Sequence, residues 1–180
     1  MSLFTKPLTK IAIKYGIIGG LISVLLLLVL FYTGKNPFLY TRKVPFGIVL
    51  VPLFIFFAIK EFRDFKNNYT LHFWQGLILG FVCYLIIALI SAGFTRIFLS
   101  YHPEMLQDIM KVGIQAIKDN KEETIKNLGE ATHIELLNTI STNTTAYVIA
   151  LEDFILKMFL GFFATLIISL VLRKNTQIID

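Results

Sequence analysis

Four long apolar blocks with few charges constrain this chain more than any other feature. They cover about residues 11–32, 44–59, 72–100 and 154–172. An apolar block of about 18 residues or more predicts a membrane-spanning helix, because a helix rises 1.5 Å per residue and the hydrocarbon core is about 30 Å thick. The sequence therefore predicts an all-α polytopic membrane protein, whose four transmembrane helices form a single membrane domain across residues 1–180.

The second block, residues 44–59, is the shortest, and Pro52 lies in its middle. A proline inside a helix removes a backbone hydrogen bond, so we expect a kink there. A re-entrant segment that turns back inside the membrane is the alternative. We favour a complete span, because the long side chain of Lys60 directly after the block can reach the membrane surface.

The composition also favours a membrane over water. Apolar residues make up 56% of the chain and charged residues 16%, whereas soluble domains have about 45–50% and about 25%. The net charge of +5 comes from lysines and arginines that flank the apolar blocks. We assign these charges to membrane orientation and to contact with anionic lipids, and we expect no binding of nucleic acid.

Residues 103–145 differ from the rest of the chain, because they carry more acidic than basic residues. Their apolar residues recur at helical spacing, which predicts an extramembrane insertion of two or three amphipathic helices. Gly129 fits a break between two of these helices, and Thr132 with Glu135 fits a capping box that would start the last one. Each helix has one apolar side that must pack on a neighbour, on the membrane or on a partner.

The distribution of basic residues predicts the orientation. Four spans place both termini on one side of the membrane, together with the loop between spans two and three. Lysines and arginines are denser on this side, where they are Lys6, Lys10, Lys14, Lys60, Arg63, Lys66, Arg173 and Lys174. Since cytoplasmic segments carry the excess of positive charge, we expect both termini in the cytoplasm and residues 103–145 outside.

Ionisable and polar residues gather at the predicted outer boundary of spans three and four. They are Arg96, Tyr101, His102, Glu104, Glu152, Asp153 and Lys157. One interpretation is a structural set of ion pairs, in which Asp153 and Lys157 are one helical turn apart and Arg96 lies opposite. The other is a functional polar site, since ionisable residues in a membrane often mark one. We favour the structural interpretation, because span four reaches full length without these charges.

Two glycine pairs predict close contacts between helices. Gly16 and Gly20 open span one, and Gly76 and Gly80 open span three. Small residues four positions apart let helix backbones approach closely. We expect spans one and three to touch at these glycines, or one of the pairs to form a homodimer face.

The sequence shows no motif for a metal, a cofactor or a catalytic centre. His72, His102 and His133 are scattered and lack the spacing of a metal site. Phosphate-binding loops, nucleophile elbows and zinc-protease motifs are absent. We therefore expect no metal and no cofactor and assign no catalytic residue, and the sequence leaves enzymatic activity open without favouring it.

The order of these parts resembles a known family. The segments that carry the likeness are "KYGIIGGLISVLLLLV", "KNPF", "PFGIVLVPLFIFFAIKEFRDF", "FWQGLILGFVCYLIIAL", "SYHPEM" and "ATLIISLVLRK". Together they resemble the small four-span inner-membrane proteins of Bacteroidota grouped as domain of unknown function 4199. The resemblance implies a bacterial inner-membrane location and transfers no functional residue. Members of this family often lie beside a membrane-associated glycosyltransferase, which implies an accessory role in glycan or lipid modification of the envelope.

Three functions stay open at this point. We favour a non-catalytic integral membrane subunit that binds and positions a partner protein in the cell envelope. The alternatives are an oligomeric transporter or channel component, for which the spans offer few polar groups, and a lipid-acting enzyme with a polar site at the outer boundary. The expected partners are membrane lipids and either a membrane protein or a second copy of the chain.

Overall fold

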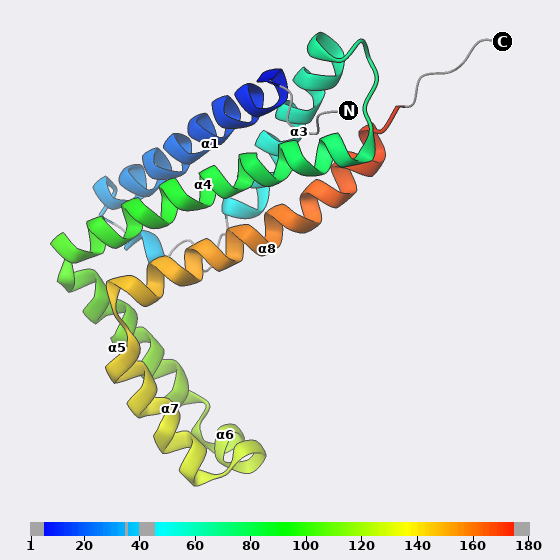
Figure 1. Cartoon of the computed structure of the whole chain (residues 1–180). Coiled ribbons are helices and arrows are strands. Elements are labelled where there is room, and N and C mark those ends of the chain that lie inside the picture. The colour runs from blue at the N-terminus through cyan, green and yellow to red at the C-terminus, as the bar shows by residue number, and fades with distance from the viewer. Residues whose placement is uncertain (1–5, 35, 40–45, 175–180) are drawn as a thin grey trace.

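The computed structural model describes residues 6–34, 36–39 and 46–174. The helices are α1 (Lys6–Tyr32), α3 (Phe46–Lys66), α4 (Phe73–Tyr101), α5 (Pro103–Asp119), α6 (Lys121–Leu128), α7 (Glu130–Asn143) and α8 (Ala146–Leu172). Helices α1, α3, α4 and α8 form an elongated bundle, and α5, α6 and α7 project from one end of it (Figure 1). The prediction of an all-helical chain is confirmed for these residues.

Successive helices of the bundle run in opposite directions. At one end, Lys14 of α1 pairs with Glu61 of α3, and Leu71 before α4 forms a backbone bridge with Lys174 after α8. The first turns of α1 and the last turn of α8 therefore lie at this same end (Figure 1). We call it the terminal end, and we call the opposite end, from which α5–α7 project, the hairpin end.

The bundle has an apolar interior and an apolar exterior. Its buried core includes Leu8, Ile11, Val51, Ile55, Ile59, Phe62, Leu79, Ile87 and Leu172. Large apolar side chains are also exposed on the outer faces, among them Leu21, Leu25, Phe81, Leu89, Phe159, Ile167 and Val171. A helix that is apolar all round belongs in a core or in a membrane, so the outer faces of this bundle suit contact with lipid.

Three helices are long and apolar enough to cross a membrane, namely Pro7–Tyr32, Phe73–Tyr101 and Ala146–Leu172. They coincide with the expected first, third and fourth spans, and the chain is a multi-pass membrane protein. Helix α3 is not among the three, so the prediction of four spans is not confirmed. Helix α3 is apolar over its first two thirds, and its last third, from Lys60 to Lys66, is charged. Residues 44 and 45 of the expected second span lie outside the described residues.

Helix α3 continues through Pro52 as one helix from Phe46 to Lys66. It packs against α1, α4 and α8, and Val51, Ile55 and Phe62 are buried in these contacts. A re-entrant segment would reverse direction within the apolar run, and α3 makes no such turn.

The projecting helices form a hairpin, in which α5 packs against α7 and α6 lies at the far tip (Figure 1). Gly129 separates α6 from α7 and has a positive φ of 86°, a conformation that glycine adopts without steric cost. This turn lets α7 begin at Glu130, directly after it and ahead of the start expected at Thr132. We call α5–α7 the hairpin below.

Candidate functional site

The boundary residues singled out by the sequence lie along and beyond the contact between α4 and α8, the most extensive helix contact in the structure. These two antiparallel helices hold one register along their whole length. The facing pairs are Gly76 and Ser169, Gly80 and Thr165, Tyr84 and Gly161, Ser91 and Asp153, and Arg96 and Tyr147. The pairs change from small residues at the terminal end to charged and aromatic residues at the hairpin end.

Glycines set the close spacing at the terminal end of this contact. A Cβ atom added to Gly80 would lie 2.4 Å from Thr165 Cγ2, and one added to Gly76 would lie 2.5 Å from Ser169 Oγ. Gly161 plays the same part on α8, because a Cβ there would lie 2.4 Å from Cγ of Tyr84. A larger residue at any of these glycines would force α4 and α8 apart.

The glycine pair of α1 lies in a different contact. Gly16 faces Ile86 of α4, and Gly20 faces Ile90, with an added Cβ only 2.8 Å from each isoleucine Cβ. The two glycine pairs therefore do not face each other: the pair on α1 packs on α4, and the pair on α4 packs on α8. All four glycines are buried within the bundle.

A buried polar cluster connects α4 and α8 nearer the hairpin end. Ser91 Oγ donates a hydrogen bond of 2.8 Å to Asp153 Oδ2, and Lys157 Nζ donates to Asp153 Oδ1. The Lys157 side chain is only 8% exposed, so its ammonium group needs the Asp153 carboxylate to offset the loss of solvent. We call Ser91, Asp153 and Lys157 the polar triad.

The two charged members of the polar triad lie inside one continuous helix. Helix α8 begins at Ala146, so the helix that was expected to start near Phe154 already includes Asp153. At 1.5 Å per residue, Asp153 lies about 28 Å and Lys157 about 22 Å above Leu172. A hydrocarbon core about 30 Å thick that begins at Leu172 therefore ends near Asp153 and contains Lys157.

Arg96 does not belong to the triad. Its guanidinium carbon lies 5.6 Å from the centre of the Tyr147 ring, and it has no ion pair with any residue in the described part of the chain. The sequence interpretation set Arg96 opposite Asp153, but the register of α4 and α8 puts Ser91 there. Arg96 instead lies opposite the first turn of α8.

The remaining boundary residues surround the corner between α4 and α5. His102 Nδ1 and Glu104 Oε1 lie 2.9 Å apart, and the His102 ring packs on Phe31 and Phe98. Hydrogen bonds from its own backbone N–H and then from His102 lower the pKa of the Glu104 carboxyl. Tyr101 is exposed. His102 links α4 to the start of α5 at this corner, and none of these side chains contacts the triad among the interactions of the described residues.

Glu152 is adjacent to Asp153 in sequence and is exposed, whereas Asp153 is half-buried. Successive residues of a helix point about 100° apart, so the two carboxylates face different surroundings. The acidic pair that the sequence grouped together is therefore divided between the outside of α8 and its contact with α4.

No sequence motif pointed to a second polar cluster, which lies at the terminal end between α1 and α3. Lys14 Nζ donates to both carboxylate oxygens of Glu61, at 3.0 and 2.8 Å, and Tyr15 Oη donates to Glu61 Oε2 at 2.6 Å. The hydrogen bonds from Lys14 and then Tyr15 lower the pKa of Glu61. The one signal in the sequence was that Lys14 and Glu61, which carry opposite charges, lie at the same predicted membrane boundary of two antiparallel helices.

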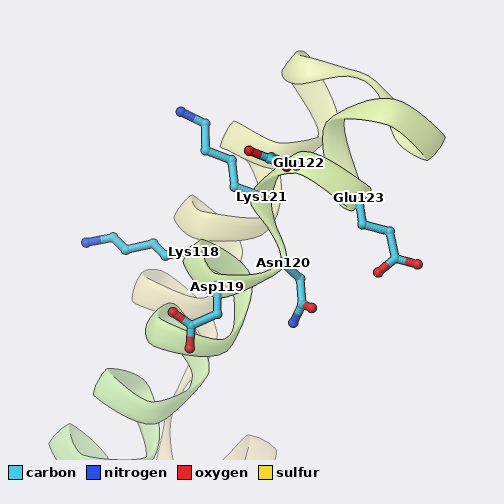
Figure 2. Close-up of a pocket in the computed structure, with 6 residues that line it drawn as sticks. All are labelled: Lys118, Asp119, Asn120, Lys121, Glu122 and Glu123. Carbon is cyan, nitrogen blue, oxygen red and sulfur yellow. The ribbon is translucent and has the colours of Figure 1, made fainter.

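A shallow hollow at the tip of the hairpin, lined by residues 118–123, offers no binding geometry. Figure 2 shows that the side chains of Lys118 and Lys121 point away from those of Asn120 and Glu123. Within the described ranges no three His, Cys, Asp or Glu residues could hold a metal ion together. His133 of α7 is buried, and its Nδ1 has no hydrogen-bond partner among the described residues.

These features define a class: a multi-pass helical membrane protein with a helical hairpin projecting from one end of its bundle. The chain matches the family model described as "Protein of unknown function (DUF4199)" over residues 14–174. Since this match covers the bundle and the hairpin, the chain belongs to that family. No curated protein and no solved structure matches it.

Proposed function

We propose that this protein is a non-catalytic integral membrane subunit that binds and positions a partner protein through its hairpin. The observation that carries the proposal is a hairpin that is anchored to the bundle at its base and exposes apolar side chains farther out. These side chains are Val112 on α5, Leu128 on α6 and Ile134 on α7, each more than half exposed.

The base of the hairpin is fixed by an apolar cluster. Phe98 and Leu99 of α4 pack with Met105 and Ile109 of α5 and with Ile149 of α8. The turn after α1 joins this anchor, because Asn36 Nδ2 donates a hydrogen bond of 3.3 Å to the carbonyl oxygen of Met105. A partner bound to the hairpin would therefore be held at a defined place relative to the membrane.

The outer half of the hairpin buries fewer side chains than its base does. Among the described residues, α6 has no buried residue and α7 has one, His133. The tip carries charges of both signs, but residues 103–145 as a whole carry seven Asp and Glu residues against four lysines. The surface therefore suits a protein with an apolar contact patch and basic residues at its rim.

We infer a topology of four spans, with α3 as the second. Helix α3 contacts the three apolar helices and exposes Val49, Leu53 and Phe57, as a lipid-facing helix does. With four spans both termini share one side, and the density of lysine and arginine supports a cytoplasmic location for that side. The hairpin then lies on the outer side of the membrane, which the resemblance to proteins of Bacteroidota implies is a bacterial inner membrane.

The class of partner follows from that resemblance. An envelope protein that modifies glycans or lipids, held at the outer surface by the hairpin, is the partner we expect. The protein would hold the partner at the membrane surface, and the partner would catalyse the reaction.

The test combines copurification with substitution. The triple variant Val112→Ser, Leu128→Ser and Ile134→Ser should abolish stoichiometric copurification of one defined protein from native membranes in mild detergent. A matched triple variant at exposed polar positions, Gln107→Ser, Lys111→Ser and Glu135→Ser, should retain it. A wild-type protein that purifies alone at native expression levels would contradict the proposal.

A further inference from the structure

We propose that the α4–α8 face binds an anionic, phosphate-bearing lipid, with its headgroup at Arg96 and one acyl chain in an aromatic groove below. The inference needs the membrane location of the bundle but no partner protein. It concerns one side of α8, between Tyr147 and Phe163.

The groove is lined by Tyr84 of α4 and by side chains of α8 from Phe154 to Phe163. Its lining on α8 is entirely apolar, with Met158 and Phe162 along its length. Gly161 lies directly under the Tyr84 ring, so α4 and α8 are close together at this point. The result is a shallow channel on the outside of the bundle, in a region that faces lipid.

The headgroup end of the face is defined by Arg96 and Tyr147. Tyr147, Phe154 and Met158 are spaced i, i+7 and i+11, so they lie on one stripe of α8. Arg96 lies over the Tyr147 ring at the top of this stripe. Its guanidinium group has no ion pair among the described residues, and its planar set of N–H donors matches the oxygen atoms of a phosphate.

The groove and the headgroup end together extend along α8 over about the depth of one membrane leaflet. At 1.5 Å per residue, Phe162 lies about 15 Å above Leu172, near the centre of a hydrocarbon core about 30 Å thick. On the same scale Tyr147 lies about 38 Å above Leu172, in the headgroup layer. The groove therefore extends from the midplane towards the surface, where the arginine meets the phosphate level.

Charge distinguishes this face from the exposed face of α1 in the described part of the chain. Helix α1 exposes Leu21, Leu25 and Val29 to lipid, but its last turn at the hairpin end has no basic residue. An acyl chain gains little by choosing one apolar face over another, because lipid surrounds them all. The fixed cation above the groove on α8 selects a lipid with a negative headgroup.

The experiment uses the full-length protein in lipid nanodiscs with a phosphatidylglycerol that carries a diazirine in its acyl chain. Peptides covering residues 154–163 should be labelled more strongly than peptides covering residues 21–29. The variant Arg96→Gln should lower labelling of residues 154–163 by about tenfold, the effect of losing a hydrogen bond to a charged group. Labelling of residues 21–29 should not change.

Three further arms separate the possible causes. Arg173→Gln makes the same change at the terminal boundary and should leave the labelling of residues 154–163 intact. Met158→Trp fills the groove and leaves Arg96 unchanged, and this variant should reduce the labelling of residues 154–163. Unlabelled phosphatidylglycerol should compete, whereas phosphatidylcholine should compete weakly and glycerol phosphate, which has no acyl chain, should not. Equal labelling of both faces in the wild type, or equal effects of Arg96→Gln and Arg173→Gln, would overturn the proposal.

Discussion

At the scale of single residues, the Asp153 carboxylate is the group that joins α8 to α4 in the polar triad. It accepts hydrogen bonds from Ser91 on α4 and from Lys157 on its own helix. The Lys157 ammonium lies within the hydrocarbon core, where no water is available to replace the Asp153 carboxylate as its partner. The polar triad therefore fixes both the register of α4 against α8 and the rotation of α8.

Replacing one member of the triad should cost more than replacing the charged pair. Asp153→Asn leaves the Lys157 ammonium buried without a counterion, and we expect a loss of about 3 kcal/mol in the free energy of unfolding. The double variant Asp153→Asn and Lys157→Met removes both charges and should recover much of that loss. Unfolding in detergent micelles measures the stability of both variants. An Asp153→Asn variant as stable as the wild type would contradict a structural role for Asp153.

The Glu61 carboxylate should make the terminal end sensitive to acid. Its pKa is lowered from 4.5 by hydrogen bonds from Lys14 and then Tyr15. A group whose pKa is lower in the folded state contributes stability above its ordinary pKa, and that contribution is lost as the pH falls through the lowered value. The melting temperature should therefore drop below about pH 4.5 in the wild type.

Glu61→Gln provides the control for this pH dependence. The amide cannot ionise, so the variant should melt lower than the wild type at pH 7 and should lose less on acidification. Parallel melting curves for the two proteins between pH 7 and pH 3 would show that Glu61 does not carry the effect.

At the scale of helices, the spacing between α4 and α8 depends on Gly76, Gly80 and Gly161. We expect Gly80→Ala to destabilise the protein by about 1–3 kcal/mol, because its Cβ would overlap Thr165 and overpacking a close contact costs that much. Gly93→Ala is the matched control on the same helix, since a Cβ there meets no atom within 4 Å. The control should be neutral or slightly stabilising, because alanine favours a helix by up to about 1 kcal/mol over glycine. Similar melting temperatures for the two variants would contradict the close contact.

Hydropathy was enough to predict the apolar helices but not all of their ends. The start of α8 was set near Phe154 because charges precede it, yet the helix begins at Ala146. Thr145 caps it there, with its Oγ1 accepting a hydrogen bond from the Val148 N–H. Hydropathy identifies the part of a helix that lies in lipid, whereas hydrogen bonds at the cap determine where the helix begins.

Contacts between helices could be predicted only in part. The glycine pairs indicated that α1 and α4 pack closely, but their partners depend on how each helix is rotated in the bundle. Gly76 faces Ser169 and Gly16 faces Ile86, pairs that share no local pattern in the sequence. The same holds for Lys14 and Glu61, which only the antiparallel pairing of α1 and α3 brings together.

At the scale of the whole molecule, the structure separates two parts with different surroundings. The bundle is apolar inside and outside, and the hairpin has a charged exterior with a few exposed apolar residues. The apolar cluster around Phe98 and Met105 joins the two parts, so the hairpin is held in place by helices that lie in the membrane. This arrangement suits a protein that holds another protein at the membrane surface.

The central claim is that four helices cross the membrane and leave the hairpin on the side opposite the termini. Single cysteines at Thr33, Asn68 and Asn120, in a Cys83→Ala background, test it through labelling of intact cells with a membrane-impermeant thiol reagent. Thr33→Cys and Asn120→Cys should react from outside, and Asn68→Cys should react only after the cells are opened. If Thr33→Cys and Asn68→Cys react from the same compartment, α3 does not cross the membrane and the four-span account is contradicted.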